Sequence, residues 1–219
     1  MKKINILAIN IAAAGVLVSG VATADVAGNL GATSNYMWRG TTQTGGAAAI
    51  SGGIDYTNES GIYAGIWTSN SSFGSPETDY YIGFGGEAGG FSYDISVIDY
   101  TYTQADDIDW IEIDLGGGIG DFSFNVGITG DIFGTDTDAL YIEAAYDFAL
   151  NDKTTLTLHV GSYDFDDEAA AAFESYVDYS ATISSGDWSF SVTDTDLDEN
   201  NFTDGDPVFV VSWGMEVGL

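Results

Sequence analysis

Asp and Glu are the residues of this chain whose number and spacing suggest a chemical role, through their carboxylates. The sequence carries 34 Asp and Glu against 4 Lys and Arg, which gives a net charge of −30. One set of these acids alternates with apolar residues, so its members share the polar faces of extended stretches. A wall of carboxylates attracts cations and repels anions, as charged rings do in channels. The acids predicted to line such a wall are Asp55, Glu87, Asp94, Glu112, Asp114, Glu143, Asp147, Asp178 and Glu216.

Basic residues are nearly absent after residue 24, where only Arg39 and Lys153 remain. Nucleic acid is therefore excluded as a partner, because nothing could neutralise its phosphates. Arg39 lies at the end of the first extended stretch and is predicted to point toward the same polar interior. There it would pair with a carboxylate or mark a narrow point.

His159, the sole histidine, also falls on a polar face. A hydrolase of the Ser–His–acid type is one alternative, since one lipid-cleaving barrel family has a similar strand number. A nucleophile needs a base that a third group positions, and no local motif supplies one. We therefore expect no enzymatic activity and no cofactor.

The segment from Asp194 to Asp198 begins like a calcium-binding loop. The EF-hand pattern requires glycine at the position of Glu199 and glutamate at the position of Gly205, so the pattern fails. Loose calcium binding by this acidic loop stays open, but no metal site is predicted.

The elements that must position these side chains are twelve stretches of alternating apolar and polar residues. This period of two is typical of strands with one buried and one polar face. The strands are expected at about residues 26–38, 47–57, 61–68, 78–87, 91–102, 108–118, 121–130, 138–149, 154–163, 175–184, 188–194 and 207–219.

Short and long connections alternate along the whole chain. Short turns rich in Gly, Asn, Asp and Ser are expected at 58–60, 88–90, 118–120, 151–153 and 184–186, and longer loops lie between them. An even strand number with this alternation is typical of outer-membrane barrels, with the short turns periplasmic. Only a closed barrel lets β structure cross a bilayer, because every backbone group then finds a partner. We predict an antiparallel transmembrane β-barrel of about 12 strands, with 10 or 14 as the alternatives.

Aromatic residues give a second sign of a membrane barrel. They are expected on the outward face as two belts at the two interfaces. The alternative is that they fill the core of a soluble β-sandwich, which would not explain the alternating loops. The belt near the short turns comprises Tyr56, Phe91, Tyr93, Phe122, Phe124, Tyr146, Phe148, Trp188 and Phe190, and the belt near the long loops comprises Tyr36, Trp38, Tyr80, Tyr102 and Phe209.

Two local features depart from the simple pattern. The apolar register of the strand at 91–102 changes after Val97, where Ile98 and Tyr100 take it over, and a β-bulge there would explain the change. In the loop at 164–174, consecutive acids precede an Ala run, which predicts a short helix because acids favour a helix start.

The first 24 residues have the pattern of a secretory signal peptide. Lys2 and Lys3 precede a short apolar stretch, and Ala22 and Ala24 form an A-x-A cleavage site. Residues 1–24 are therefore predicted to be cleaved and residues 25–219 to form the barrel. The alternative is a membrane anchor, but the apolar stretch is short for a span.

The start of the remaining chain resembles the TorF-type porin family, also known as Gcw_chp, a conserved proteobacterial group of unknown function. The resemblance is carried by residues 28–40 with Thr42, Gln43 and Thr44, by 53–56 and 60–70, and by 79–83. It implies an outer-membrane location in a Gram-negative bacterium and a pore. Insertion would need the barrel-assembly machinery, which usually reads a terminal aromatic residue, whereas this chain ends in Leu219.

These observations predict a porin-like channel, embedded in outer-membrane lipid, for passive diffusion of small solutes and preferably of cations. The main alternative is a plugged structural or adhesive barrel whose acidic loops bind a surface partner or divalent cations. Such a plug needs bulky inward residues, which Tyr63, Trp67, Tyr81, Trp110, Tyr141 and Tyr163 could supply. The acidity itself has a second explanation, adaptation of the protein surface to a salty habitat. The sequence leaves the oligomeric state open.

Overall fold

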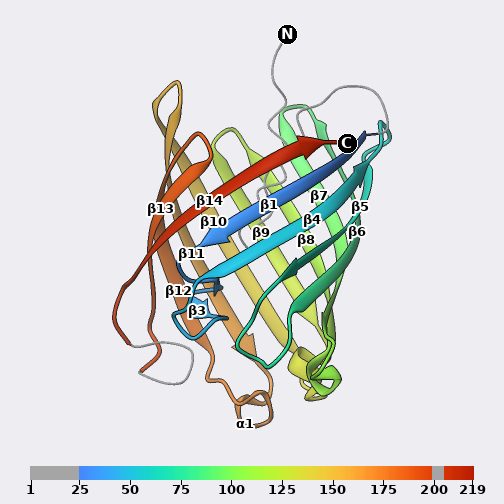
Figure 1. Cartoon of the computed structure of the whole chain (residues 1–219), viewed down its shortest axis with the longest axis vertical. Coiled ribbons are helices and arrows are strands. Elements are labelled where there is room, and N and C mark those ends of the chain that lie inside the picture. The colour runs from blue at the N-terminus through green and yellow to red at the C-terminus, as the bar shows by residue number, and fades with distance from the viewer. Residues whose placement is uncertain (1–24, 199–204) are drawn as a thin grey trace.

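The chain forms a closed antiparallel barrel of twelve strands, as predicted (Figure 1). The computed structural model describes residues 25–198 and 205–219; the predicted signal peptide, 1–24, lies outside them. Each barrel strand pairs with its neighbours in sequence, and β1 closes the barrel against β14. The barrel strands are β1 (Asp25–Thr33), β4 (Ala49–Thr57), β5 (Ile62–Ser69), β6 (Glu77–Ala88), β7 (Phe91–Tyr102), β8 (Trp110–Ile119), β9 (Phe122–Thr129), β10 (Ala139–Asn151), β11 (Thr154–Phe165), β12 (Tyr176–Ser185), β13 (Trp188–Thr195) and β14 (Val208–Gly218).

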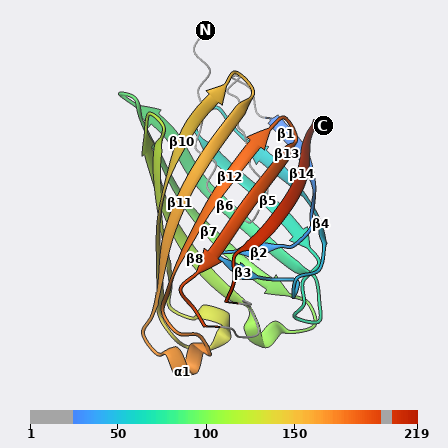
Figure 2. The same ribbon diagram turned by 90° about the vertical axis from the view of Figure 1, so that its left-hand side faces the viewer.

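Short turns and long loops lie at opposite ends of the barrel (Figures 1 and 2). The C-terminus and the start of β1 share the short-turn end. The long loops carry the 3-10 helices η1 (Asp106–Ile108) and η2 (Ile132–Gly134) and the predicted short helix, α1 (Glu168–Ala171). Asp167 caps α1 by accepting hydrogen bonds from the backbone N–H groups of Ala169 and Ala170, each at 3.1 Å. The residues described include no helix that is both long and apolar enough to cross a membrane.

The outer face of the barrel is apolar. Aliphatic side chains such as Ile82, Ile113 and Val160 are exposed there. All aromatic residues predicted for the belt near the short turns are exposed on this face, which confirms that belt. The other belt is only partly confirmed. Tyr80 and Phe209 are exposed, whereas Tyr36, Trp38 and Tyr102 pack with residues of the barrel interior.

Those three aromatic residues are inside because the long-loop end of the barrel is filled. The strand predicted at 26–38 ends at Thr33, and the chain then forms a separate two-stranded hairpin, β2 (Met37–Trp38) and β3 (Thr41–Thr42). Figure 2 shows this hairpin within the barrel outline.

The predicted bulge near Val97 is wrong. β7 pairs without a register shift with β6 over Phe91–Tyr102 and with β8 over Phe91–Tyr100. Ile98 and Tyr100 lie on the inward face and are buried because they pack with the other buried side chains of the interior. The apolar residues of β7 therefore lie on the outward face up to Val97 and on the inward face after it, while the backbone stays regular. A register shift occurs instead in β10, between Ala149 and Asn151.

Candidate functional site

The β2–β3 hairpin is closed by Arg39 and Gly40. Both have positive φ, 48° and 77°, as a two-residue type I′ turn requires. A left-handed conformation is unfavourable for a residue with a side chain, so Arg39 must be held there by its contacts. The turn places the guanidinium of Arg39 at the tip of the hairpin.

Hydrogen bonds within the loop and to the barrel wall hold the hairpin in place. The Asn35 side-chain oxygen accepts from the hydroxyls of Thr42 and Thr44, at 2.6 and 3.1 Å. The backbone N–H of Gln43 donates to the carbonyl of Tyr36 at 2.7 Å. The Tyr36 hydroxyl donates to Glu77 of β6 at 2.5 Å, which fixes the loop to the barrel wall.

The hairpin crosses the lumen. It leaves β1, while its tip contacts strands that lie several places away in the barrel order. The Tyr176 hydroxyl of β12 donates to the Arg39 carbonyl at 2.9 Å. Gly40 is so close to the wall that a methyl group on it would lie 2.5 Å from Thr195 and 2.7 Å from Asp178. The hairpin is therefore packed against the wall and narrows the long-loop end of the lumen.

Arg39 and Glu112 of β8 form a buried bidentate ion pair, with N–O distances of 2.6 and 2.9 Å. The guanidinium carbon also lies 4.3 Å from the ring centre of Trp38, 4.1 Å from that of Tyr141 and 4.7 Å from that of Tyr163. Burial alone would lower the pKa of Arg39, but the adjacent Glu112 carboxylate raises it well above its ordinary value. The predicted pairing of Arg39 with a carboxylate is confirmed.

Aromatic side chains surround this ion pair at the long-loop end. Tyr100 and Trp110 stack in parallel with ring centres 4.1 Å apart. Trp38 from the hairpin makes edge contacts with both of them and with Tyr163 and Phe133. Most of the residues that the sequence suggested for a plug belong to this region. Trp67, Tyr81, Trp110, Tyr141 and Tyr163 are buried, and Tyr63 is half-buried.

Several carboxylates on the inward face of the barrel are held in place by neighbouring wall residues. Asp55 accepts hydrogen bonds from the Tyr81 hydroxyl and the Asn29 amide. The Tyr63 hydroxyl donates to Asp94 at 2.8 Å. The Asn125 amide donates to Asp114 at 2.6 Å, and the Tyr141 hydroxyl donates to Asp178 at 2.9 Å. These predicted wall acids all point inward. Because each is a hydrogen-bond acceptor, its orientation in the wall is fixed.

Nearer the short turns the inward acids are exposed. Glu87, Asp147 and Glu216 occupy inward positions of their strands and are accessible to solvent. Asp147 accepts a hydrogen bond from Thr157 at 2.6 Å. Inward acids are therefore exposed near the short turns, whereas packed side chains narrow the interior toward the long loops.

Sequence reasoning missed Glu77 and Asp79, which are both buried on the inward face of β6. Glu77 accepts from the hydroxyls of Tyr36 and Tyr102, each at 2.5 Å. Neither side-chain oxygen of Asp79 has a hydrogen-bond partner among the described residues. The sequence did contain a signal for both acids. Tyr80 is predicted to face outward and Tyr81 inward, and Glu77 and Asp79 lie an even number of residues from Tyr81, so they share its inward face.

His159 lies between two carboxylates. Its Nε2 is 2.9 Å from Glu143, and its Nδ1 is 3.4 Å from Asp178. The Tyr141 hydroxyl is 3.3 Å from Nε2. In the part of the chain that the structure describes, neither ring nitrogen of His159 is hydrogen-bonded to a serine hydroxyl, as the Ser–His–acid alternative would require. Within residues 25–198 and 205–219, no three or more His, Cys, Asp or Glu side chains are arranged to hold a metal ion.

Comparison with known proteins agrees with this architecture. A family model described as a bacterial protein of unknown function, Gcw_chp, matches residues 18–213. No curated protein matches the sequence.

Two solved structures show the same fold at low identity. One is a chain from work on the in-meso crystallization of membrane proteins, with a TM-score of 0.57 and 7% identity over 89% of this chain and 83% of that chain. The other is the NanC porin, with a TM-score of 0.54 and 9% identity over 88% of this chain and 98% of that chain. The barrel is thus similar to that of a porin.

Proposed function

The chain belongs to the Gcw_chp family of bacterial proteins of unknown function, and on that premise we propose that it is an outer-membrane channel for passive diffusion of small solutes that prefers cations. The observation that carries the proposal is the acidic lumen of a porin-like barrel. Carboxylates from many strands point into one space, and within residues 25–198 and 205–219 the basic side chains that meet them are Arg39, which pairs with Glu112, and His159, which lies between Glu143 and Asp178. Such a wall favours cations over anions.

The outer membrane of a Gram-negative bacterium is the location that fits the outer face. That face is apolar and carries an aromatic belt near the short turns. The barrel as a whole has a fold similar to that of the NanC porin. Cleavage of residues 1–24, insertion by the barrel-assembly machinery and the TorF-type designation belong to the same proposal.

The contribution of Glu112 to cation preference is smaller than its position suggests. Arg39 neutralises its charge through the bidentate pair. Acids without a basic partner, such as Asp55 and Asp94, and the exposed Glu87 and Glu216 then supply the attraction. The hairpin restricts passage at the long-loop end to small solutes.

The test is swelling of liposomes that contain the refolded protein, in isotonic solutions of small neutral, cationic and anionic solutes of similar size. We expect the fastest swelling with the cationic solute. Equal rates for all three, or the fastest rate with the anion, would refute the cation preference.

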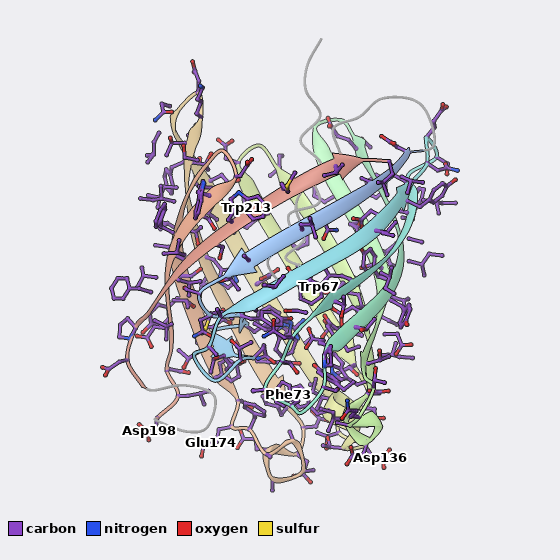
Figure 3. The ribbon with its side chains drawn as sticks, viewed as in Figure 1. Trp67, Phe73, Asp136, Glu174, Asp198 and Trp213 are labelled. Atoms are coloured by element: carbon purple, nitrogen blue, oxygen red, sulfur yellow. The ribbon has the colours of Figure 1, made fainter. Side chains whose placement is uncertain are left out.

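A plugged adhesive barrel is the second candidate, and the aromatic packing at the long-loop end favours it. Exposed acids extend from that end, among them Asp136, Glu174 and Asp198 (Figure 3). A folded, inserted barrel that produces no swelling with any solute would support this candidate over the channel.

A further inference from the structure

We propose that Glu112, Tyr141 and Tyr163 form a guanidinium-binding site in the barrel wall, and that Arg39 occupies this site as a tethered ligand. The three side chains come from β8, β10 and β11, and none of them belongs to the hairpin that carries Arg39. The site is thus a property of the wall, and the hairpin supplies its occupant.

The geometry matches a guanidinium rather than a simple ammonium. Glu112 accepts two bonds, from Nη1 at 2.9 Å and from Nη2 at 2.6 Å. The planar fork of a guanidinium makes such a pair, whereas an ammonium is a point charge. The rings of Tyr141 and Tyr163 lie 4.1 and 4.7 Å from the guanidinium carbon, and a flat cation also stacks on aromatic faces.

Two glycines of the wall leave the room that the cation fills. A methyl group on Gly127 of β9 would lie 2.9 Å from both Nη2 of Arg39 and the Glu112 carboxylate. A methyl group on Gly161 of β11 would collide both with the Tyr141 hydroxyl and with the Asp178 carboxylate to which that hydroxyl donates. Side chains at either position would displace the guanidinium or the ring that it contacts.

Glu112 is 1% exposed with Arg39 in place, and withdrawal of Arg39 removes the partner of this carboxylate. An unpaired buried charge is strongly unfavourable, so the vacated wall favours another cation of the same shape. When the hairpin moves away from the wall, a free guanidinium compound would occupy the site that Arg39 has left. Occupation of the site requires only the folded barrel, but a role of that exchange in solute entry rests on the proposed channel function.

The experiment uses the Arg39→Ala variant of the refolded barrel, with ethylguanidinium chloride as probe and ethylammonium chloride at equal ionic strength as control. Thermal denaturation is followed by tryptophan fluorescence, so the readout does not depend on conduction. The Lys153→Ala variant removes an equal charge from an exposed short turn and is the matched control.

We expect saturable stabilisation of Arg39→Ala by ethylguanidinium, at concentrations roughly tenfold lower than ethylammonium requires, because the second charge-assisted hydrogen bond is lost with ethylammonium. Lys153→Ala should show no such effect, since Arg39 still fills its site. Adding Glu112→Gln to Arg39→Ala should abolish the stabilisation.

Equal effects of the two cations, or stabilisation that survives Glu112→Gln, would overturn the proposal. If Arg39→Ala refolds poorly, its folded yield becomes the readout. Ethylguanidinium in the refolding buffer should raise that yield and ethylammonium should not, and no difference between them would equally overturn the proposal. Absence of conductance would contradict the channel and leave this binding result to be judged separately.

Discussion

Gly40→Ala tests whether the β2–β3 hairpin is seated against the barrel wall. Gly40 has a φ of 77°, and a methyl group there would lie 2.5 Å from Thr195 and 2.7 Å from Asp178. Gly46, in the same loop, has a φ of 79° but nothing within 4 Å of the added methyl group. Gly46→Ala is therefore a control that shares the backbone strain and lacks the collision.

The magnitude follows from separating these two contributions. An L-residue in the left-handed region costs about 1–2 kcal/mol, and both variants pay it. Overpacking against the wall adds about 1–3 kcal/mol to Gly40→Ala alone. If the hairpin relieves this strain by leaving the wall, its seated population falls roughly 5-fold to 140-fold relative to Gly46→Ala, since 1.4 kcal/mol is tenfold.

The assay is single-channel conductance in planar bilayers, with thermal denaturation of the same preparations. Gly40→Ala should show a larger conductance, or more frequent large openings, than Gly46→Ala, together with a lower melting temperature. If the two variants have the same conductance and the same melting temperature, the hairpin is not packed in the lumen and the reasoning fails.

Three further substitutions test individual wall residues. Asp79→Asn should raise the free energy of unfolding by roughly 1–3 kcal/mol, because it removes a buried carboxylate whose oxygens lack partners among the described residues; lower stability in a urea titration would contradict this. Tyr102→Phe should lower it by roughly 1.5–3 kcal/mol, since it removes one of the hydroxyl donors to the buried Glu77 carboxylate, and an unchanged midpoint would count against that bond. Glu87→Gln should weaken cation preference more than Glu174→Gln, because Glu87 is an exposed acid on the inward face whereas Glu174 is an exposed loop acid; equal shifts in reversal potential would place the selectivity in the loops.

The strands could be predicted from the sequence because each has its own periodic signal. In β9, Phe122, Phe124 and Val126 face outward and alternate with small or polar residues, so a single strand reveals both faces. Strand parity also predicted which acids face inward, because a residue's side of the sheet is fixed by counting along the strand. That local rule needs no knowledge of the neighbouring strands.

The hairpin could not be predicted, because its place depends on contacts far away in the sequence. Tyr36 and Trp38 continue the alternation of β1, so the pattern alone extended that strand. What ends the strand is the packing of Trp38 and Arg39 against β7, β8, β10 and β11. The mistaken bulge at Val97 has the same origin, since the inward apolar residues of β7 meet that packing.

The reversal potential of the refolded wild-type barrel across a KCl gradient tests the central claim most directly. An acidic lumen of a porin-like channel predicts discrete conductance steps and a reversal potential of the sign that potassium selectivity gives. A reversal potential of the opposite sign, which marks chloride selectivity, would contradict it.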